Sequence, residues 1–134
     1  MFVFGCEQGG RLDHLDLYRP GSGICTILKN QDGAFSTAYQ GVGIGIESYN
    51  LRSPDGRAFD FDNDQSEQLD HIAFYRPGIG IFWVIQNNGH GTFSPFCHQG
   101  SAGLEIAGYD LKSVDDVAFV FYYDPTGKMD HTVL

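Results

Sequence analysis

Apolar and polar residues alternate with a period of two along most of this chain, and no sustained period of 3.6 residues is present. The stretch from Leu12 to Tyr18 is typical, because it divides its side chains between two faces. One face holds Asp13, Leu15 and Leu17, and the other holds Leu12, His14, Asp16 and Tyr18. Such alternation predicts short β-strands and an all-β fold.

Turn signals separate these strands at regular intervals. Arg-Pro-Gly at 19–21 and 76–78 predicts a turn, because proline removes a ladder donor and glycine adopts unusual dihedrals. Asn-Gln-Asp-Gly at 30–33 and the stretch 87–91 are hairpin signals. The pattern predicts strands at 2–4, 12–18, 24–29 and 35–40, then at 58–59, 69–75, 81–86 and 93–99. The glycine-rich stretches 42–56 and 101–116 are expected to be loops with a short extended piece.

The same blocks recur in one order along the chain. Asp-His pairs at 13–14, 70–71 and 130–131 are spaced by 70 − 13 = 57 and 130 − 70 = 60 residues. Repeats are therefore predicted at 1–57 and 58–117, with the opening of a third at 118–134. Four short antiparallel strands in each unit match the size and content of a β-propeller blade.

Two blades cannot close a ring, and open blades leave unpaired strand edges. We therefore expect several chains to assemble head to tail until the ring closes, as a homo-oligomer. The duplicated segment 118–134 is the difficulty, because it repeats residues 1–17. A self-contained sandwich of about ten strands is the alternative architecture.

Composition narrows the range of partners. The chain has 134 residues and a formal charge of −9, which argues against binding nucleic acid or an anionic membrane. Its three cysteines, an odd number, predict reduced and partly buried thiols rather than a disulfide framework. We expect no signal peptide and no membrane insertion, which favours the cytoplasm or leaderless secretion.

The acidic stretch before the second Asp-His pair resembles the loop of the FG-GAP/VCBS type of propeller repeat. Here it runs Asp62-x-Asp64-x-Ser66-x-x-x-Asp70 and is followed by an apolar strand and Arg-Pro-Gly. The resemblance implies a calcium site at Asp62, Asp64, Ser66 and Asp70. Ser66 replaces the usual aspartate, and Glu67 replaces the usual glycine. The alternative is an ordinary turn in which Asp70 caps backbone amides.

The resemblance also extends to fungal and bacterial sugar-binding propellers, which implies glycans as ligands. Candidate ligand-binding residues lie along the strands and at their ends: Tyr18, Arg19, His71, Tyr75, Arg76 and Trp83. An arginine at a strand end holds either sugar hydroxyls or carboxylates such as Asp55 and Asp115. Trp83 either stacks on a sugar ring or fills the space between blades with Ile81 and Ile85.

No enzyme signature is present in the sequence. Neighbouring strand residues point to opposite faces, so Asp70 and His71 are not expected to work together, and the histidine is expected to be hydrogen-bonded between blades. The leading prediction is thus a non-catalytic, multivalent lectin. The alternative is a structural or protein-interaction propeller, in which the candidate sugar-binding residues are buried.

Overall fold

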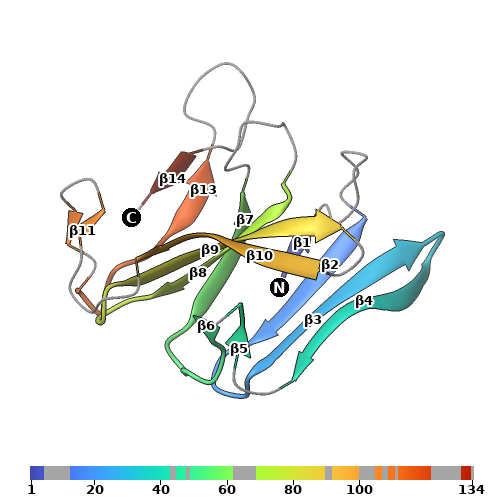
Figure 1. The fold of residues 1–134 in the computed structure, drawn as a ribbon, viewed down its shortest axis with the longest axis horizontal. Helices are drawn as coiled ribbons and strands as arrows, with labels where there is room; N and C mark the ends of the chain where they lie inside the picture. The colour runs from blue at the N-terminus through green and yellow to red at the C-terminus, as the bar shows by residue number, and fades with distance from the viewer. Residues whose placement is uncertain are drawn as a thin grey trace.

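The computed structural model of the protein consists of antiparallel β-sheets, and no helix occurs among the described residues. These are 1–4, 13–42, 45–47, 49–61, 69–89, 92–99, 105–106, 109–110, 112–121 and 131–133. The strands are β1 (Phe2–Phe4), β2 (His14–Arg19), β3 (Ile24–Gln31), β4 (Ala34–Val42), β5 (Gly45–Ile46), β6 (Tyr49–Asn50), β7 (Arg57–Phe61), β8 (His71–Arg76), β9 (Ile81–Gly89), β10 (Thr92–Gln99), β11 (Glu105–Ile106), β12 (Tyr109–Asp110), β13 (Phe119–Phe121) and β14 (His131–Val133). Figure 1 shows their arrangement.

Two four-stranded sheets form the body of the molecule. The first sheet has the order β1-β2-β3-β4, and the second has β7-β8-β9-β10. Each is a meander, in which every strand pairs with the next one along the chain. The hairpins β5–β6, β11–β12 and β13–β14 complete the described structure. The prediction of an all-β fold with four antiparallel strands in each full repeat is confirmed for these two sheets.

The repeat in sequence is also a repeat in strand register. His14 pairs with Lys29 in the first sheet, and His71 pairs with Gln86 in the second, an offset of 57 on both sides. The first two strands of each repeat are likewise in matching register, since the backbone partners of histidines 14, 71 and 131 are phenylalanines 4, 61 and 121. The outer hairpins share an irregularity, because Ala38 and Phe96 are each an extra residue between paired neighbours. Equivalent sequences therefore form equivalent strands with equivalent bulges.

The predicted turns have the backbone geometry that their residues favour. Asp32 and Gly33, in the β3–β4 turn, both have positive φ angles of 53° and 94°. This is the geometry of the two-residue hairpin turns that Asp-Gly favours. The Arg-Pro-Gly turns repeat a long-range contact, since the amides of Gly21 and Gly78 donate to the carbonyls of Ser53 and Ser113, each at 3.0 Å.

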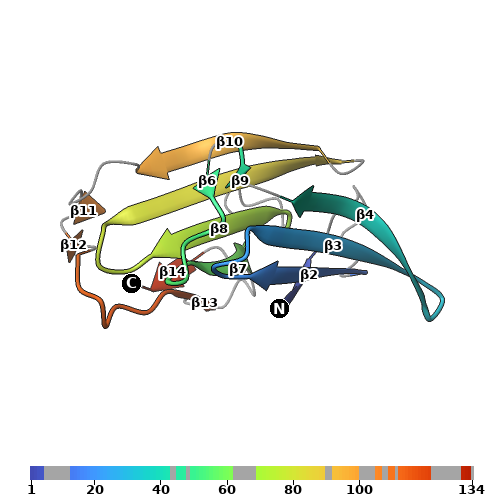
Figure 2. The same ribbon diagram turned by 90° about the horizontal axis from the view of Figure 1, so that it is seen from below.

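The strand groups lie in sequence order across the molecule, and Figure 2 shows the same arrangement from below. β1 lies against β7, and β7 lies against β13. A first core fills the space between the two sheets and includes Cys25 and Ile27 from the first sheet and Ile72, Phe74 and Ile85 from the second. A second core lies on the other face of the second sheet, where Ala118, just before β13, packs against it.

The second sheet is therefore covered on both faces, and the first sheet on one. In β8 the five residues from His71 to Tyr75 are all buried, whereas in β2 buried and exposed positions alternate. Sequence explains the difference, because β8 is apolar on both faces after His71, and β2 carries Asp16 between its leucines. Runs of apolar residues without alternation are typical of strands buried on both sides.

The loop predictions need one refinement. The stretch 42–56 contains the two short strands β5 and β6, and the hairpin that they form contributes Ile46 and Tyr49 to the first core. Two-residue strands carry too little periodicity to be seen in a sequence. Cys25 is a buried free thiol, as predicted, whereas Cys6 and the side chain of Cys97 lie outside what the structure describes.

Candidate functional site

The Asp-His pairs at 13–14 and 70–71 are in direct contact, contrary to the prediction. Nδ1 of His14 lies 2.6 Å from Oδ1 of Asp13, and Nδ1 of His71 lies 2.7 Å from Oδ1 of Asp70. The opposite-face argument fails because each aspartate precedes its strand, which begins at the histidine. The carbonyls of Asp13 and Asp70 accept hydrogen bonds from the amides of residues 30 and 87, at 2.8 and 3.0 Å.

In both pairs the histidine is buried and the aspartate is partly exposed. His14 is 2% exposed and His71 is 0% exposed. The His71 ring also meets the edge of Phe96, with ring centroids 5.4 Å apart. A carboxylate on Nδ1 fixes the tautomer and orientation of an imidazole. The prediction of a hydrogen-bonded histidine is confirmed for His14, and at His71 the structure gives the close contact with Asp70.

Arg76 and Tyr18, two of the predicted ligand residues, come together where the two sheets meet. The guanidinium of Arg76 lies 5.1 Å from the ring centre of Tyr49, which stacks on Phe74 at 4.6 Å. Tyr18 meets the same Phe74 edge-on, at 5.7 Å. Arg76 also donates from Nη2 to the carbonyl of Asn50 at 2.8 Å. Arg76 thus contacts the β5–β6 hairpin through both its charge and a hydrogen bond.

Tyr49 and Phe74 form the buried part of this cluster, and Tyr18 and Arg76 are partly exposed. Burial raises the pKa of both the Tyr18 and the Tyr49 hydroxyl. Tyr49 is 2% exposed, and Phe74 is fully buried. Cation–π contacts of this kind contribute about 0.5–2 kcal/mol, depending on desolvation. The arginine therefore contacts a backbone carbonyl and an aromatic ring, rather than Asp55 or Asp115, the carboxylates considered from the sequence.

Tyr75 lies on the opposite face of the second sheet from Arg76. Its side chain is fully buried in the second core with Phe82 and Val84. Burial raises the pKa of the Tyr75 hydroxyl, and the neighbouring carboxylate of Asp116 raises it further. Tyr75 therefore contacts the second core, on the face of the second sheet against which Ala118 packs.

Trp83 is partly buried and packs against the first core together with Ile81. Its cross-strand partner is Phe74, and Ile85 next on its face is fully buried. The neighbours of Trp83 on its strand face, Ile81 and Ile85, are therefore those of a core position. Among the six predicted ligand residues, all of them described, only Arg19 is exposed, and its carbonyl accepts a hydrogen bond from the Ser22 hydroxyl at 2.9 Å.

Most of the predicted calcium loop lies outside the described residues. Asp62, Asp64 and Ser66 are not described, and Asp70 is engaged with His71. Within the described ranges, no group of three or more histidine, cysteine, aspartate or glutamate side chains is arranged to hold a metal ion. The calcium site stays a prediction from the acidic loop.

A buried carboxyl that sequence reasoning passed over lies inside the first core. Asp16 is fully buried, and the thiol of Cys25 donates to its two oxygens at 3.5 and 3.6 Å. Burial raises the pKa of Asp16 to about 7, and the carboxylate of Asp60 adds to the rise. Burial also raises the pKa of Asp60 to about 6 and that of the Cys25 thiol well above its usual range. A thiol held protonated is a poor nucleophile.

The sequence contains a signal for this buried carboxyl. Asp16 shares its strand face with His14 and Tyr18, and it falls in the middle of an alternating strand rather than at an end. The equivalent position in the second repeat is Ala73, at an offset of 57. A charged residue where the other copy has alanine indicates a polar group inside the core.

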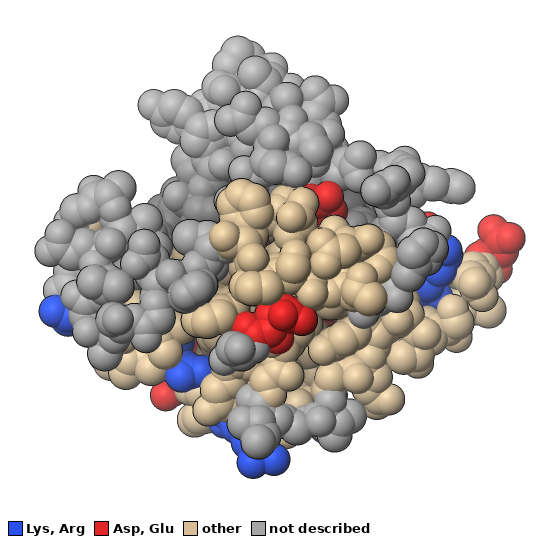
Figure 3. Space-filling view, viewed as in Figure 1, with Lys and Arg blue, Asp and Glu red and all other residues tan. Residues whose placement is uncertain are grey.

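The described charged side chains do not form a cluster on the face that Figure 3 shows, where they are few and scattered. In the part of the chain that the structure describes, no helix is long and apolar enough to cross a membrane. Comparison with known proteins found no matching family model, no similar curated protein and no similar solved structure. The functional argument therefore rests on the residues of this chain alone.

Proposed function

We propose that this chain is a non-catalytic module of the β-propeller type, whose role is structural or protein-binding. The observation that carries the proposal is the repeated strand register. Three successive units begin with the same pairing, and their first strands β1, β7 and β13 lie side by side. Meanders that stack face to face with neighbouring first strands are the arrangement expected of consecutive blades.

The position of the candidate sugar-binding residues supports this role over a lectin. His71 and Tyr75 are fully buried, and Trp83 packs against the first core. A sugar site needs aromatic and polar side chains that converge on an exposed pocket, with the ring faces available for stacking. In a structural module the same residues serve packing between sheets, as they do in these contacts.

Carbohydrate binding is the second candidate, and Arg19 favours it. This arginine is exposed at the end of β2, beside an Arg-Pro-Gly turn that recurs in the second repeat. Guanidinium groups donate several hydrogen bonds in a fixed geometry, which suits sugar hydroxyls. Repeated weak sites on an assembled ring would gain strength through multivalency. Calcium bound by Asp62, Asp64, Ser66 and Asp70 would then stabilise a loop.

A glycan array separates the two candidates. For a structural module, we expect no saturable binding to any glycan, with or without added calcium. The Arg19→Ala variant provides the matched control, because it alters an exposed side chain and leaves both cores intact. Binding that saturates in the parent protein and is lost in Arg19→Ala would overturn the structural proposal and establish the lectin.

We further propose that copies of the chain complete the ring. The support is that one face of the first sheet remains partly exposed in the single chain, as described next. Oligomer mass in solution, measured by light scattering, tests this part independently of sugar binding. A mass well above 14.8 kDa is expected.

A further inference from the structure

The first sheet has one covered face and one open face. On the covered face, His14, Asp16, Cys25 and Ile27 are buried. The other face, which we call the open face, is partly exposed along both β2 and β3. It consists of Leu15, Leu17, Ile24, Thr26 and Leu28, and the exposed Arg19, which pairs with Ile24, lies at its edge.

The second repeat shows what covers this face when a neighbour is present. The positions equivalent to Leu15, Leu17 and Leu28 are Ile72, Phe74 and Ile85, each at an offset of 57. All three equivalents are fully buried in the first core, where they meet Cys25 and Ile27 of the first sheet. By contrast, Leu17 is 36% exposed. The open face therefore has the positions and the apolar character of a surface that is a sheet–sheet interface elsewhere in the same chain.

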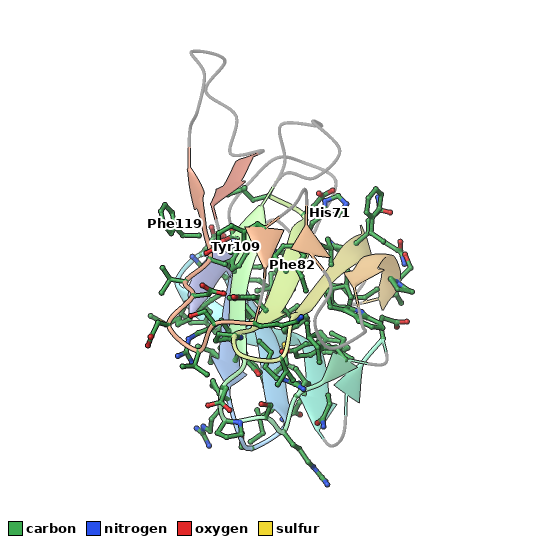
Figure 4. All side chains as sticks on the ribbon, turned by 90° about the vertical axis from the view of Figure 1, so that its left-hand side faces the viewer. His71, Phe82, Tyr109 and Phe119 are labelled. Atoms are coloured by element: carbon green, nitrogen blue, oxygen red, sulfur yellow. The ribbon has the colours of Figure 1, made fainter. Side chains whose placement is uncertain are left out.

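The opposite end of the stack presents the complementary surface. Phe119, the first residue of β13, is exposed, whereas Ala118 just before the strand packs against the second core. Phe119 is 49% exposed, and Figure 4 shows it at the outer edge of the molecule while Phe82 lies among the strands. Its equivalent in the second repeat is Phe59, at an offset of 60, which packs against the second core 6.3 Å from Phe82. Val117, two residues before Phe119, is 65% exposed.

From these two ends we infer that a second copy of this chain docks on the open face, through the surface of its β13 that carries Phe119. This inference rests on the proposed propeller-type stacking and identifies the two surfaces that meet. The contact would repeat the internal interface between the two sheets. The open face would take the place of the face of the second sheet that carries Ile72, Phe74 and Ile85. Because the two surfaces differ, the association is heterologous and continues until a ring closes.

The occupant is a second copy because the chain already contains this interface internally. The second sheet packs on the first through the face that carries Ile72, Phe74 and Ile85, and the open face is the equivalent of that face in the first repeat. The chain therefore already forms this kind of interface once. The net charge of −9 opposes association in general, but neither contact surface adds a carboxylate. A largely apolar contact of this kind is compatible with that charge.

The experiment uses two charged substitutions, one at each end. Leu17→Asp places a carboxylate on the open face, and Phe119→Asp places one on the opposite surface. Both side chains are partly exposed in the single chain, so both variants are expected to fold, which circular dichroism and thermal melting verify. Ile79→Asp is the matched control, because Ile79 is 40% exposed in the turn between β8 and β9, outside both surfaces.

The parent protein and Ile79→Asp should be oligomeric by size-exclusion chromatography with light scattering, and each of the two other variants should be monomeric. Mixing Leu17→Asp with Phe119→Asp should then give a one-to-one complex of two chains, because the mixture restores one intact contact. An oligomer that persists in either variant refutes docking through these two surfaces, but it does not contradict the proposed structural role. Two folded monomeric variants that fail to combine overturn head-to-tail docking, as does a monomeric parent protein.

Discussion

Neutralising the buried Asp16 should change how the stability of the protein depends on pH. The folded pKa of Asp16 is raised from 3.8 to about 7 because burial penalises the charged carboxylate. The carboxylate of Asp60 adds to this rise, and the hydrogen bond from Cys25 and the charge of the amino terminus partly oppose it. A group with a raised folded pKa binds more protons in the folded state than in the unfolded state between the two pKa values. The contribution of Asp16 to the free energy of unfolding is therefore fully present below about pH 4 and is lost as pH rises through about 7.

The size of the effect follows from the shift. About three pH units correspond to roughly 4 kcal/mol over the whole range, at about 1.36 kcal/mol for each unit. Between pH 5.5 and pH 8, a folded pKa near 7 gives a loss of about 2 kcal/mol. Asp60, with a pKa raised to about 6 by burial, should add a smaller loss of the same sign at the lower end of this range.

Urea unfolding, followed by the fluorescence of Trp83, measures this loss at several pH values. In Asp16→Asn the side chain remains neutral at every pH and still accepts a hydrogen bond from the Cys25 thiol. We expect this variant to lose about 2 kcal/mol less than the parent protein between pH 5.5 and pH 8. It should also be the more stable of the two at pH 8.

Asp32→Asn is the control, because Asp32 is exposed in the β3–β4 turn and asparagine tolerates its positive φ of 53°. This variant should follow the parent profile. If Asp16→Asn and the parent protein show parallel profiles across the range, Asp16 does not ionise inside the core and the reasoning fails.

Two further predictions concern the candidate sites. If the acidic loop binds calcium, added calcium should raise the melting temperature by mass action, and Asp62→Ala should abolish that increase; identical melting with excess calcium and with chelator would exclude the metal. Trp83→Ala should lower the free energy of unfolding by about 3 kcal/mol, because the ring packs against the first core. A variant with unchanged melting that loses glycan binding, by about 1–3 kcal/mol in affinity, would instead assign Trp83 to sugar stacking.

Much of the fold could be predicted because the signals are local. Alternation in β2 and β3, the turn residues Asp32 and Gly33, and the repeat spacing of 57 are all properties of short segments. These signals determine strand type, pairing and register. What they do not determine is which face of a sheet is covered, because coverage depends on a partner that is distant in sequence. Leu17 and Phe74 occupy equivalent positions in their repeats, yet Leu17 is 36% exposed and Phe74 is buried.

The candidate site was harder to predict for the same reason. Arg19 and Arg76 each precede a Pro-Gly turn, but the contact with Tyr49 is made by Arg76, because the β5–β6 hairpin lies against the second sheet. The Asp-His contact was missed because strand alternation was applied one residue beyond the start of the strand. Sequence periodicity locates strands to within about two residues, and a side chain at the boundary escapes the rule.

The two interfaces within the stack differ in chemistry, which bears on where the molecule would open. The core between the first and second sheets contains the buried Asp16 and, beside it, the thiol of Cys25. The equivalent positions in the second core are Ala73 and Phe82, which bring no titratable group. As pH rises through 7, ionisation of Asp16 is expected to weaken the first interface. The contact between the two full repeats should therefore lose stability over this pH range, even though both contacts are built from the same repeat.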